Sequence, residues 1–189
     1  MTYDESIASF RTDPIGADPE HSRWIETLQD STLVAIRPMT EHDTGAERTF
    51  IEALAPRLRR MRFQGQLVCP FVMLARQFEE IDRGRTLAFA AFIPDGLNES
   101  MLGVSTYSTN SDGSSCTCDV AVLDAWHRRG LGSMLMRHLI QIARGQGIDY
   151  MFGTDSVQNA PMIELAERLG FSQQVNPRDR SQILHGLWL

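Results

Sequence analysis

The chain has 189 residues, of which 42% are hydrophobic and 22% are charged. This length and composition fit one soluble globular domain with a full core, and they exclude a disordered or fibrous protein. The net charge of −6 comes without a basic stripe, so we expect no nucleic-acid partner. No stretch approaches the ~18 consecutive apolar residues of a membrane span, and the acidic start lacks the features of a secretion signal. We therefore expect a cytoplasmic protein with no membrane partner.

The N-terminal part of the chain differs in pattern from the rest. Residues 1–31 contain one short amphipathic stretch, SRWIETLQD, and we expect them to form a peripheral N-terminal arm. Residues 32–189 carry regular alternations of strand and helix patterns, with no internal repeat or low-complexity tract. One domain is therefore expected at 32–189.

The first predicted elements are a strand and two helical segments. The run TLVAIRP at residues 32–38 reads as a strand that ends in proline, and Thr40 with Asp43 resembles a helical capping box. Helix-period apolar positions follow at residues 47–63, with a proline interruption, and again at residues 70–81. This order predicts strand, helix, helix before the centre of the chain.

Three β-rich runs then follow one another, at residues 86–93, 101–109 and 115–123. The two loops between them are short and rich in turn residues, as in hairpins, so we expect an antiparallel meander. A helix with one apolar face is predicted from residue 131 to the glycines of GQG.

The pattern of the last third of the chain predicts a strand, then a helix, then a final strand. The run IDYMFGTDS is a strand candidate, and QILHGLWL reads as the terminal strand. The helix between them has Asn159 as a candidate N-cap, Pro161 in its first turn and Gly170 as its stop.

A glycine-containing turn, DAWHRRGLGS, joins the third β-rich run to the helix at residue 131. A helix N-terminus presents free backbone N–H groups that bind anions. Gly130 and Gly132 remove the side chains that would keep an anion away. The turn therefore predicts a phosphate cradle. A P-loop or dinucleotide site is disfavoured, because HRRGLGS lacks the P-loop lysine and no βαβ unit precedes it.

The three cysteines are Cys69, Cys116 and Cys118. Their odd number in a chain of this size argues against a disulfide framework. Cys116 and Cys118 share one face of a predicted strand, but no second cysteine pair accompanies them. We therefore expect buried thiols and no metal site.

The order of elements, with AWHRRGLGSMLM and QNAPMIELAERLGF, resembles the GNAT superfamily of acyl-CoA-dependent N-acyltransferases over residues 33–189. The family's pyrophosphate signature is Gln or Arg, two residues, Gly, one residue, then Gly or Ala, and it reads HRRGLG at residues 127–132. Within the superfamily, AIRPMTEHD, FIEALAP and MRF are similar to the acetyltransferase domain of bacterial Pat-type protein lysine acetyltransferases. The resemblance implies an α/β (α+β) fold, with a mixed, mostly antiparallel central sheet flanked by helices and two strands that splay apart around acyl-CoA.

The resemblance also implies acetyl-CoA as cosubstrate, with its pyrophosphate in the cradle and its pantetheine arm along the preceding strand. The cofactor-binding residues expected on this basis are Val120, Ala121, Val122, Leu123, His127, Arg128, Arg129, Gly130, Leu131, Gly132, Ser133 and Asn159. Two of them have alternatives, because His127 could simply be exposed and Asn159 could act only as a helix cap.

An amine acceptor would attack the thioester directly. Free lysine has a pKa of ~10.4, so a base or a desolvating site must offset about 4 kcal/mol near neutral pH. Family members usually place a glutamate nine residues before the position of Trp126, where this chain has Thr117. Asp119 lies on the same face of the strand and is the predicted base, although pairing with an arginine or exposure to solvent would also explain it. Asp155 is a second candidate for holding the amine.

The usual acid of the family, a tyrosine four residues before the GF dipeptide, is replaced here by Ala166. Ser156 or a water molecule is expected to protonate the leaving thiolate instead. An acyl-enzyme on Cys116 or Cys118 is disfavoured because the sequence places no histidine to activate either thiol.

The sequence thus predicts an acetyl-CoA-dependent N-acetyltransferase that acts on a primary amine, either a protein lysine or a small amine. The alternative is a non-catalytic acyl-CoA-binding regulatory module. We expect residues 61–71 and the helical segments around them to wall the acceptor site, and whether two copies form a homodimer is left open.

Overall fold

The computed structural model describes residues 22–54, 86–95 and 98–189, and their centre is an eight-stranded sheet. The strand order is β1-β2-β3-β4-β5-β6-β8-β7, and every neighbouring pair is antiparallel except β5 and β6, which are parallel. The strands are β1 (Trp24–Thr27), β2 (Leu33–Pro38), β3 (Thr86–Asp95), β4 (Asn98–Thr109), β5 (Ser115–Val122), β6 (Tyr150–Ser156), β7 (Ser172–Val175) and β8 (Gln182–Trp188). The expected mixed, mostly antiparallel sheet and its β3-β4-β5 meander are confirmed.

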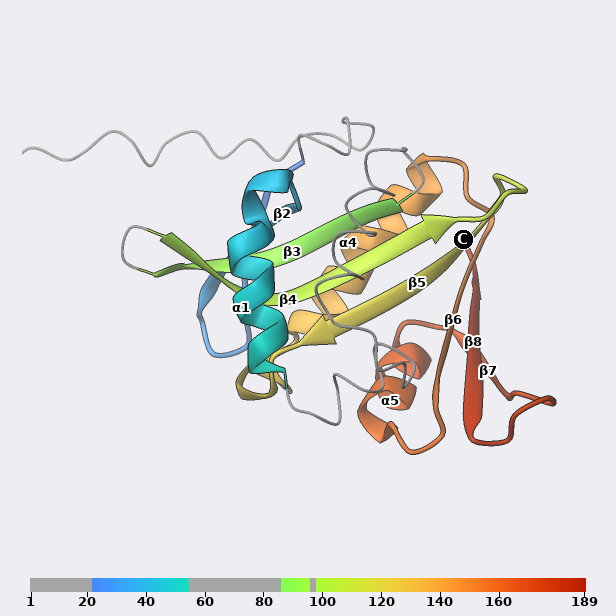
Figure 1. The fold of residues 1–189 in the computed structure, drawn as a ribbon. Helices are drawn as coiled ribbons and strands as arrows, with labels where there is room; N and C mark the ends of the chain where they lie inside the picture. Colours follow the sequence, from blue (N-terminus) through green and yellow to red (C-terminus); the bar gives the residue numbers. More distant parts are fainter. Residues whose placement is uncertain (1–21, 55–85, 96–97) are drawn as a thin grey trace, which may run out of the picture.

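Three α-helices flank the sheet in the described part of the chain, α1 (Thr44–Ala53), α4 (Leu131–Gly145) and α5 (Ala160–Arg168). Figure 1 shows α1 crossing the near face of β3 and β4, while α4 lies behind the sheet. Two short 3-10 turns, η3 (Glu41–Asp43) and η4 (Asp124–Trp126), precede α1 and the loop before α4. No helix in these described segments is both long and apolar enough to cross a membrane.

The larger part of the core lies between the sheet and α4. The helix buries the stripe predicted from its 3.6-residue period, which includes Leu131, Leu135 and Leu139, against β-strand residues such as Phe89 and Ile36. A second cluster forms on the opposite face, where Phe50 and Ile51 of α1 pack on β3 and β4. α4 ends before Gly147, which adopts a positive φ of 77°, and α5 ends before Gly170, at φ 86°.

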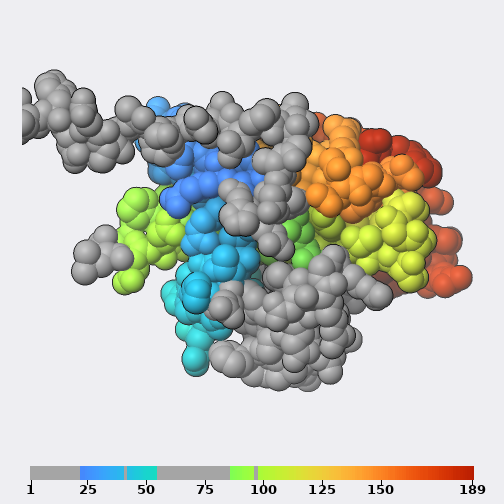
Figure 2. Space-filling view, turned by 90° about the horizontal axis from the view of Figure 1, so that it is seen from above, coloured from blue at the N-terminus to red at the C-terminus, as the bar shows by residue number. Residues whose placement is uncertain are grey.

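The beginning of the described chain differs from the expected arm. Residues 24–27 form β1, which pairs antiparallel with β2 at the edge of the sheet. Trp24 is partly buried, lies edge-on to Phe89 and stacks on His138 of α4 at 4.2 Å between ring centroids. Figure 2 shows the blue N-terminal strands seated beside the orange α4. From residue 24 onward this segment therefore belongs to the sheet, because its aromatic side chain reaches the core.

Several local expectations can be compared with the structure directly. The predicted capping box of Thr40 and Asp43 is confirmed, and in it Asp43 accepts the backbone N–H of Thr40 at 2.9 Å. The short strand β7 is not foreseen by the sequence analysis, because SQQV has too few apolar residues to show a period. The second helical segment and the wall expected at residues 61–71 lie outside the described residues.

Candidate active site

The parallel strands β5 and β6 are paired over only three residues each. The pairs join Ser115, Cys116 and Thr117 to residues 150–152. Beyond them β5 remains paired with β4 as far as Val122, and β6 remains paired with β8. The two strands therefore part from Cys118 onward, as the splayed arrangement requires.

The parting leaves backbone groups of β5 facing an open gap. The N–H of Leu123 is bonded to Leu102 of β4 at 2.9 Å, so the odd-numbered residues of β5 direct their backbone groups to β4. The even-numbered residues face the gap, and Val120 offers both its N–H and its C=O there. The carbonyl of Val122 is already bonded to Nε2 of His127 at 2.9 Å. An extended ligand could thus add to β5 mainly at Val120.

The loop and helix N-terminus that the sequence predicts as a phosphate cradle lie at the start of α4. The first helical bond runs from the N–H of Met134 to the C=O of Gly130 at 3.1 Å, and no side chain caps the helix. Gly130 has a φ of 90° and Arg128 a φ of 59°, so the loop bends through the left-handed region twice. At Gly132 a Cβ would lie 3.5 Å from Leu165 of α5, in ordinary contact. The free N–H groups of this first turn therefore open onto the gap without a covering side chain.

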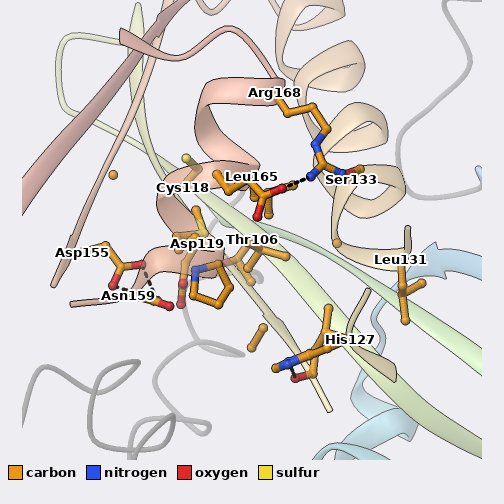
Figure 3. Close-up of a pocket in the computed structure, with 18 of the residues that line it drawn as sticks. Thr106, Cys118, Asp119, His127, Leu131, Ser133, Asp155, Asn159, Leu165 and Arg168 are labelled. Carbon is orange, nitrogen blue, oxygen red and sulfur yellow. Dashed lines mark hydrogen bonds and ion pairs between the residues drawn. The ribbon is translucent and has the colours of Figure 1, made fainter. Parts of the chain in front are cut away.

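The gap and the cradle form one cleft of about 760 Å³. It is lined from β4, β5, the loop before α4, the first turn of α4, β6 and α5, as Figure 3 shows for the labelled side chains. The predicted site residues that line it are Asp119, Val120, Ala121, Val122, His127, Arg128, Gly130, Leu131, Gly132, Ser133 and Asn159. The structure thus brings most of the predicted set together.

Three predicted residues do not line this cleft. The Arg129 guanidinium pairs with Asp30 at 2.8 Å and lies over the Trp126 ring, so it braces the loop instead of facing a phosphate. Leu123 packs on the α1 side of the sheet. The Ser156 hydroxyl accepts the N–H of Gln158 at 3.2 Å within the turn after β6. Position in the motif alone could not reveal these side-chain directions.

Two carboxylates stand where β5 and β6 part. Asp119 projects from β5 on the face that α1 covers, opposite Thr106 of β4, and Asp155 comes from β6. Burial raises the pKa of Asp155 above its usual value, and the Asp119 charge adds to the rise, while hydrogen bonds from Asn159 and Ser156 oppose it. Figure 3 shows both carboxylates beside Asn159 at one end of the cleft.

The opposite end of the cleft carries positive charge. Arg128 lines it beside the cradle, and Arg168 reaches it from the last turn of α5. Arg168 also pairs with Glu164 at 2.6 Å, one turn back on the same helix. Arg168 was missed in the sequence, although a basic residue in the last turn of α5 was a visible signal.

The thiols of β5 are poorly suited to act as nucleophiles. Cys116 is fully buried, and burial raises its pKa to about 12. Burial also raises the pKa of Cys118, which lines the cleft. A thiol attacks as its thiolate, so neither group is activated at neutral pH. The remaining cysteine, Cys69, lies outside the described residues.

Position 166, where family members usually carry the tyrosine acid, is buried and does not face the cleft. Ala166 is buried in the core between α5 and the sheet, at 1% exposure. No tyrosine of the described residues lines the cleft.

A parted sheet edge beside an uncapped helix N-terminus suits an extended, phosphate-bearing ligand. The family model for the acetyltransferase (GNAT) family matches residues 70–171 of this chain. A relative, acetyltransferase PA5475 of Pseudomonas aeruginosa, is 36% identical over 170 residues, which cover 90% of this chain and 91% of that protein. The chain therefore belongs to the GNAT family of acetyltransferases.

Solved structures agree with this fold. The GNAT domain of S. lividans PAT superposes with a TM-score of 0.79 at 20% identity, covering 92% of this chain and all of that domain, 100%. The acetyltransferase yncA of Salmonella typhimurium, described as putative and solved with its cofactor acetyl-CoA, gives a TM-score of 0.64 at 23% identity over 82% of this chain and 94% of that one. At these identities the likeness establishes the GNAT fold.

Proposed function

We propose that this chain transfers an acetyl group from acetyl-CoA to a primary amine by direct attack of the amine. The observation that carries the proposal is the placement of Asp119, a carboxylate, at the point where β5 and β6 part. A cosubstrate arm added to β5 at Val120 would bring its end to this carboxylate. The comparisons support the cosubstrate, because the yncA structure holds acetyl-CoA.

The residues of the cleft fit acetyl-CoA at both ends. The uncapped first turn of α4, with Arg128 and Arg168 nearby, suits a pyrophosphate, and the apolar wall of Val120, Val122 and Leu165 suits a pantetheine arm. When bound there, acetyl-CoA supplies the acetyl group as a thioester.

The residues of the chain would handle the protons. Asp119 would accept the proton of the attacking ammonium, directly or through a water molecule, which frees the nitrogen lone pair to bond the acetyl carbon. As the bond to sulfur breaks, a water molecule would pass the second proton of the nitrogen to the leaving thiolate, since Ser156 does not line the cleft. The buried thiols take no part, which favours direct transfer over an acyl-enzyme.

The acidic end of the cleft favours a cationic acceptor. Asp119 would attract an ammonium group and hold it near the thioester, whereas the Asp155 carboxylate accepts hydrogen bonds from Asn159 and Ser156 instead. A lysine side chain of a protein carries such a group, and the fold shared with the S. lividans PAT domain supports that choice. A small primary amine fits the same chemistry, and the cytoplasmic location and a homodimer stay predictions.

The test combines binding and turnover in one sample. Acetyl-CoA is titrated into the protein by calorimetry, and thiol release is then followed on adding mixed amines and lysine-containing proteins. Asp119→Asn should keep binding within about threefold and lower turnover at least ~100-fold. Asp149→Asn, which changes an exposed aspartate in the turn before β6, is the matched control. The chain contains no lysine, so acetyl-lysine detected in the mixture comes from the acceptor.

A non-catalytic acyl-CoA-binding module is the second candidate, and it is favoured by the absence of both the family glutamate at Thr117 and the tyrosine at Ala166. Binding with no thiol release from any acceptor would support it. No binding of acetyl-CoA at all would contradict both candidates.

A further inference from the structure

The sequence suggested Asn159 as the N-cap of α5, but its side chain makes no cap hydrogen bond to that helix. Its Nδ2 donates to both carboxylate oxygens of Asp155, at 3.0 and 3.1 Å, and makes no cap hydrogen bond. Asp155 also accepts the N–H of Ser156 at 2.7 Å. The carboxylate is thus bonded on several sides by donors of its own loop.

This contact fixes the direction of an amide that faces the cleft. An ionised carboxylate can only accept hydrogen bonds, so it selects the NH₂ side of the Asn159 amide. The carbonyl oxygen, Oδ1, must then point away from Asp155, and it accepts no hydrogen bond from the described residues. An amide N–H of a bound ligand is the kind of donor that this oxygen would accept.

A buried histidine lies behind this pair. His185 of β8 stands opposite Gly153 of β6, on the same face of the sheet as Asp155. It is 3% exposed, and neither ring nitrogen has a hydrogen-bond partner in the described part of the chain. Burial lowers the pKa of His185, whereas the Asp155 charge opposes that shift. A buried imidazole without a partner is costly, which indicates a role for it.

The other charged groups around the pair are few among the described residues. Asp119 acts on Asp155 from β5, and Cys118 lies beside Gly153, whose added Cβ would be 3.7 Å from the Cys118 sulfur. On α5, Glu164 and Arg168 pair with each other, and the strand β7 contributes no charged side chain. Among the described residues, the charges that act on Asp155 are therefore mainly those of Asp119 and His185.

We propose that Asp155 and His185 are positioning residues for the acetyl-CoA arm: Asp155 holds the Asn159 carbonyl toward the cleft, and His185 keeps Asp155 ionised. The proposal rests on the proposed function. A protonated Asp155 could donate a hydrogen bond, so the Asn159 amide could turn over and present NH₂ to the cleft instead. No hydrogen bond joins His185 to Asp155, so the imidazole acts on the carboxylate through its charge, which lowers the pKa of Asp155.

The first test exchanges the two side chains. Asp155→Asn should weaken acetyl-CoA binding about tenfold, the value of one hydrogen bond between neutral groups, without changing the KM of the amine. The double variant Asp155→Asn with Asn159→Asp restores the amide-carboxylate pair but directs the carboxylate to the cleft. We expect it to regain the wild-type Tm while binding acetyl-CoA at least ~10-fold more weakly. Restored binding in the double variant would overturn the proposal, as would a raised amine KM in Asp155→Asn.

The second test follows acetyl-CoA affinity from pH 8 to pH 5 by calorimetry. Because His185 lowers the pKa of Asp155, its removal raises that pKa, and the acid loss of affinity should begin at higher pH in His185→Leu than in the wild type. At pH 8 the two proteins should bind within about threefold of each other. Identical pH profiles would show that His185 does not act on Asp155. If the wild type fails to bind acetyl-CoA, the proposed function itself is wrong, whereas binding that none of these variants alters refutes only this inference.

Discussion

Arg129 donates a hydrogen bond from Nη1 to Oδ2 of Asp30 at 2.8 Å, which fastens the turn between β1 and β2 to the loop before α4. The backbone N–H of Gln29 also bonds the C=O of Arg129 at 3.3 Å. The next residue back, Arg128, has the positive φ that an L-amino acid adopts reluctantly. The N-terminal hairpin therefore supports the shape of the cradle from outside the cleft.

Asp30→Ala should weaken acetyl-CoA binding because the strained loop loses its external support. The pair is exposed, so we expect only about a threefold change in affinity and little change in Tm. Asp179→Ala is the control, since Asp179 bonds only its own turn between β7 and β8. Calorimetry with both variants checks the prediction, and equal affinities would show that the hairpin does not shape the cradle.

Gly130→Ala should disturb the cradle directly. A side chain at a φ of 90° costs roughly 1–2 kcal/mol, and relief of this strain would move the N–H groups of the first turn of α4. We expect a lower free energy of unfolding and about tenfold weaker binding of acetyl-CoA. Gly145→Ala, in the last turn of the same helix with open space around it, should be neutral or slightly stabilising. Urea unfolding and calorimetry measure both effects. If Gly130→Ala bound acetyl-CoA as tightly as the wild type, the turn at Gly130 would not be the phosphate cradle.

Arg37→Met should destabilise the fold far from the cofactor. Arg37 bonds Asp43 at 2.7 Å and Glu99 at 2.9 Å, and Asp43 is only 7% exposed. Removing the guanidinium leaves a buried carboxylate without its cation, at a cost of about 3 kcal/mol. Arg48→Met, which breaks an exposed pair within α1, should cost less than ~0.5 kcal/mol. Urea denaturation at pH 7 compares them, and equal losses would refute the argument.

The buried carboxylate of Asp43 also predicts how the stability of the fold changes in acid. Burial alone would raise the pKa of Asp43, but the Arg37 and Thr40 hydrogen bonds hold it below its usual value of 3.8. The stability that the ionised Asp43 contributes to the fold is therefore fully present above pH 3.8. It is lost as the pH falls through the lower pKa that Asp43 has in the folded protein. Asp43→Asn should flatten the fall of Tm below pH 4.

His185 predicts a second pH effect on stability, of opposite origin. Its pKa is lowered by burial, so below pH 6.5 the unfolded chain binds a proton that the folded chain does not. Stability from this site is present above pH 6.5 and is lost as the pH falls. His185→Leu should therefore gain stability relative to the wild type on going from pH 8 to pH 5, by up to about 1.4 kcal/mol per pH unit. A constant difference in Tm over this range would contradict the prediction.

Much of the fold could be predicted because its local signals agree with one another. The apolar stripe of α4, Pro161 near the start of α5 and the turn-rich loops of the meander each point to the element that forms. The glycines at 130 and 132 likewise located the cradle, since only a helix N-terminus free of side chains serves that purpose. β1 was missed because its four residues carry too short a pattern, and its strand partner is supplied by the sheet.

The sequence by itself determined the elements, the cradle and the family resemblance, because backbone preference and motif spacing are local properties. Only the tertiary structure decided how far β5 and β6 pair, that Arg129 braces a hairpin, and that Asn159 bonds Asp155 in front of His185. The physical reason is that side-chain direction, burial and charge coupling depend on neighbours from distant parts of the chain. The sequence predicted the terminal strand QILHGLWL, which contains His185, but only the packed sheet placed this histidine on the same face as Asp155.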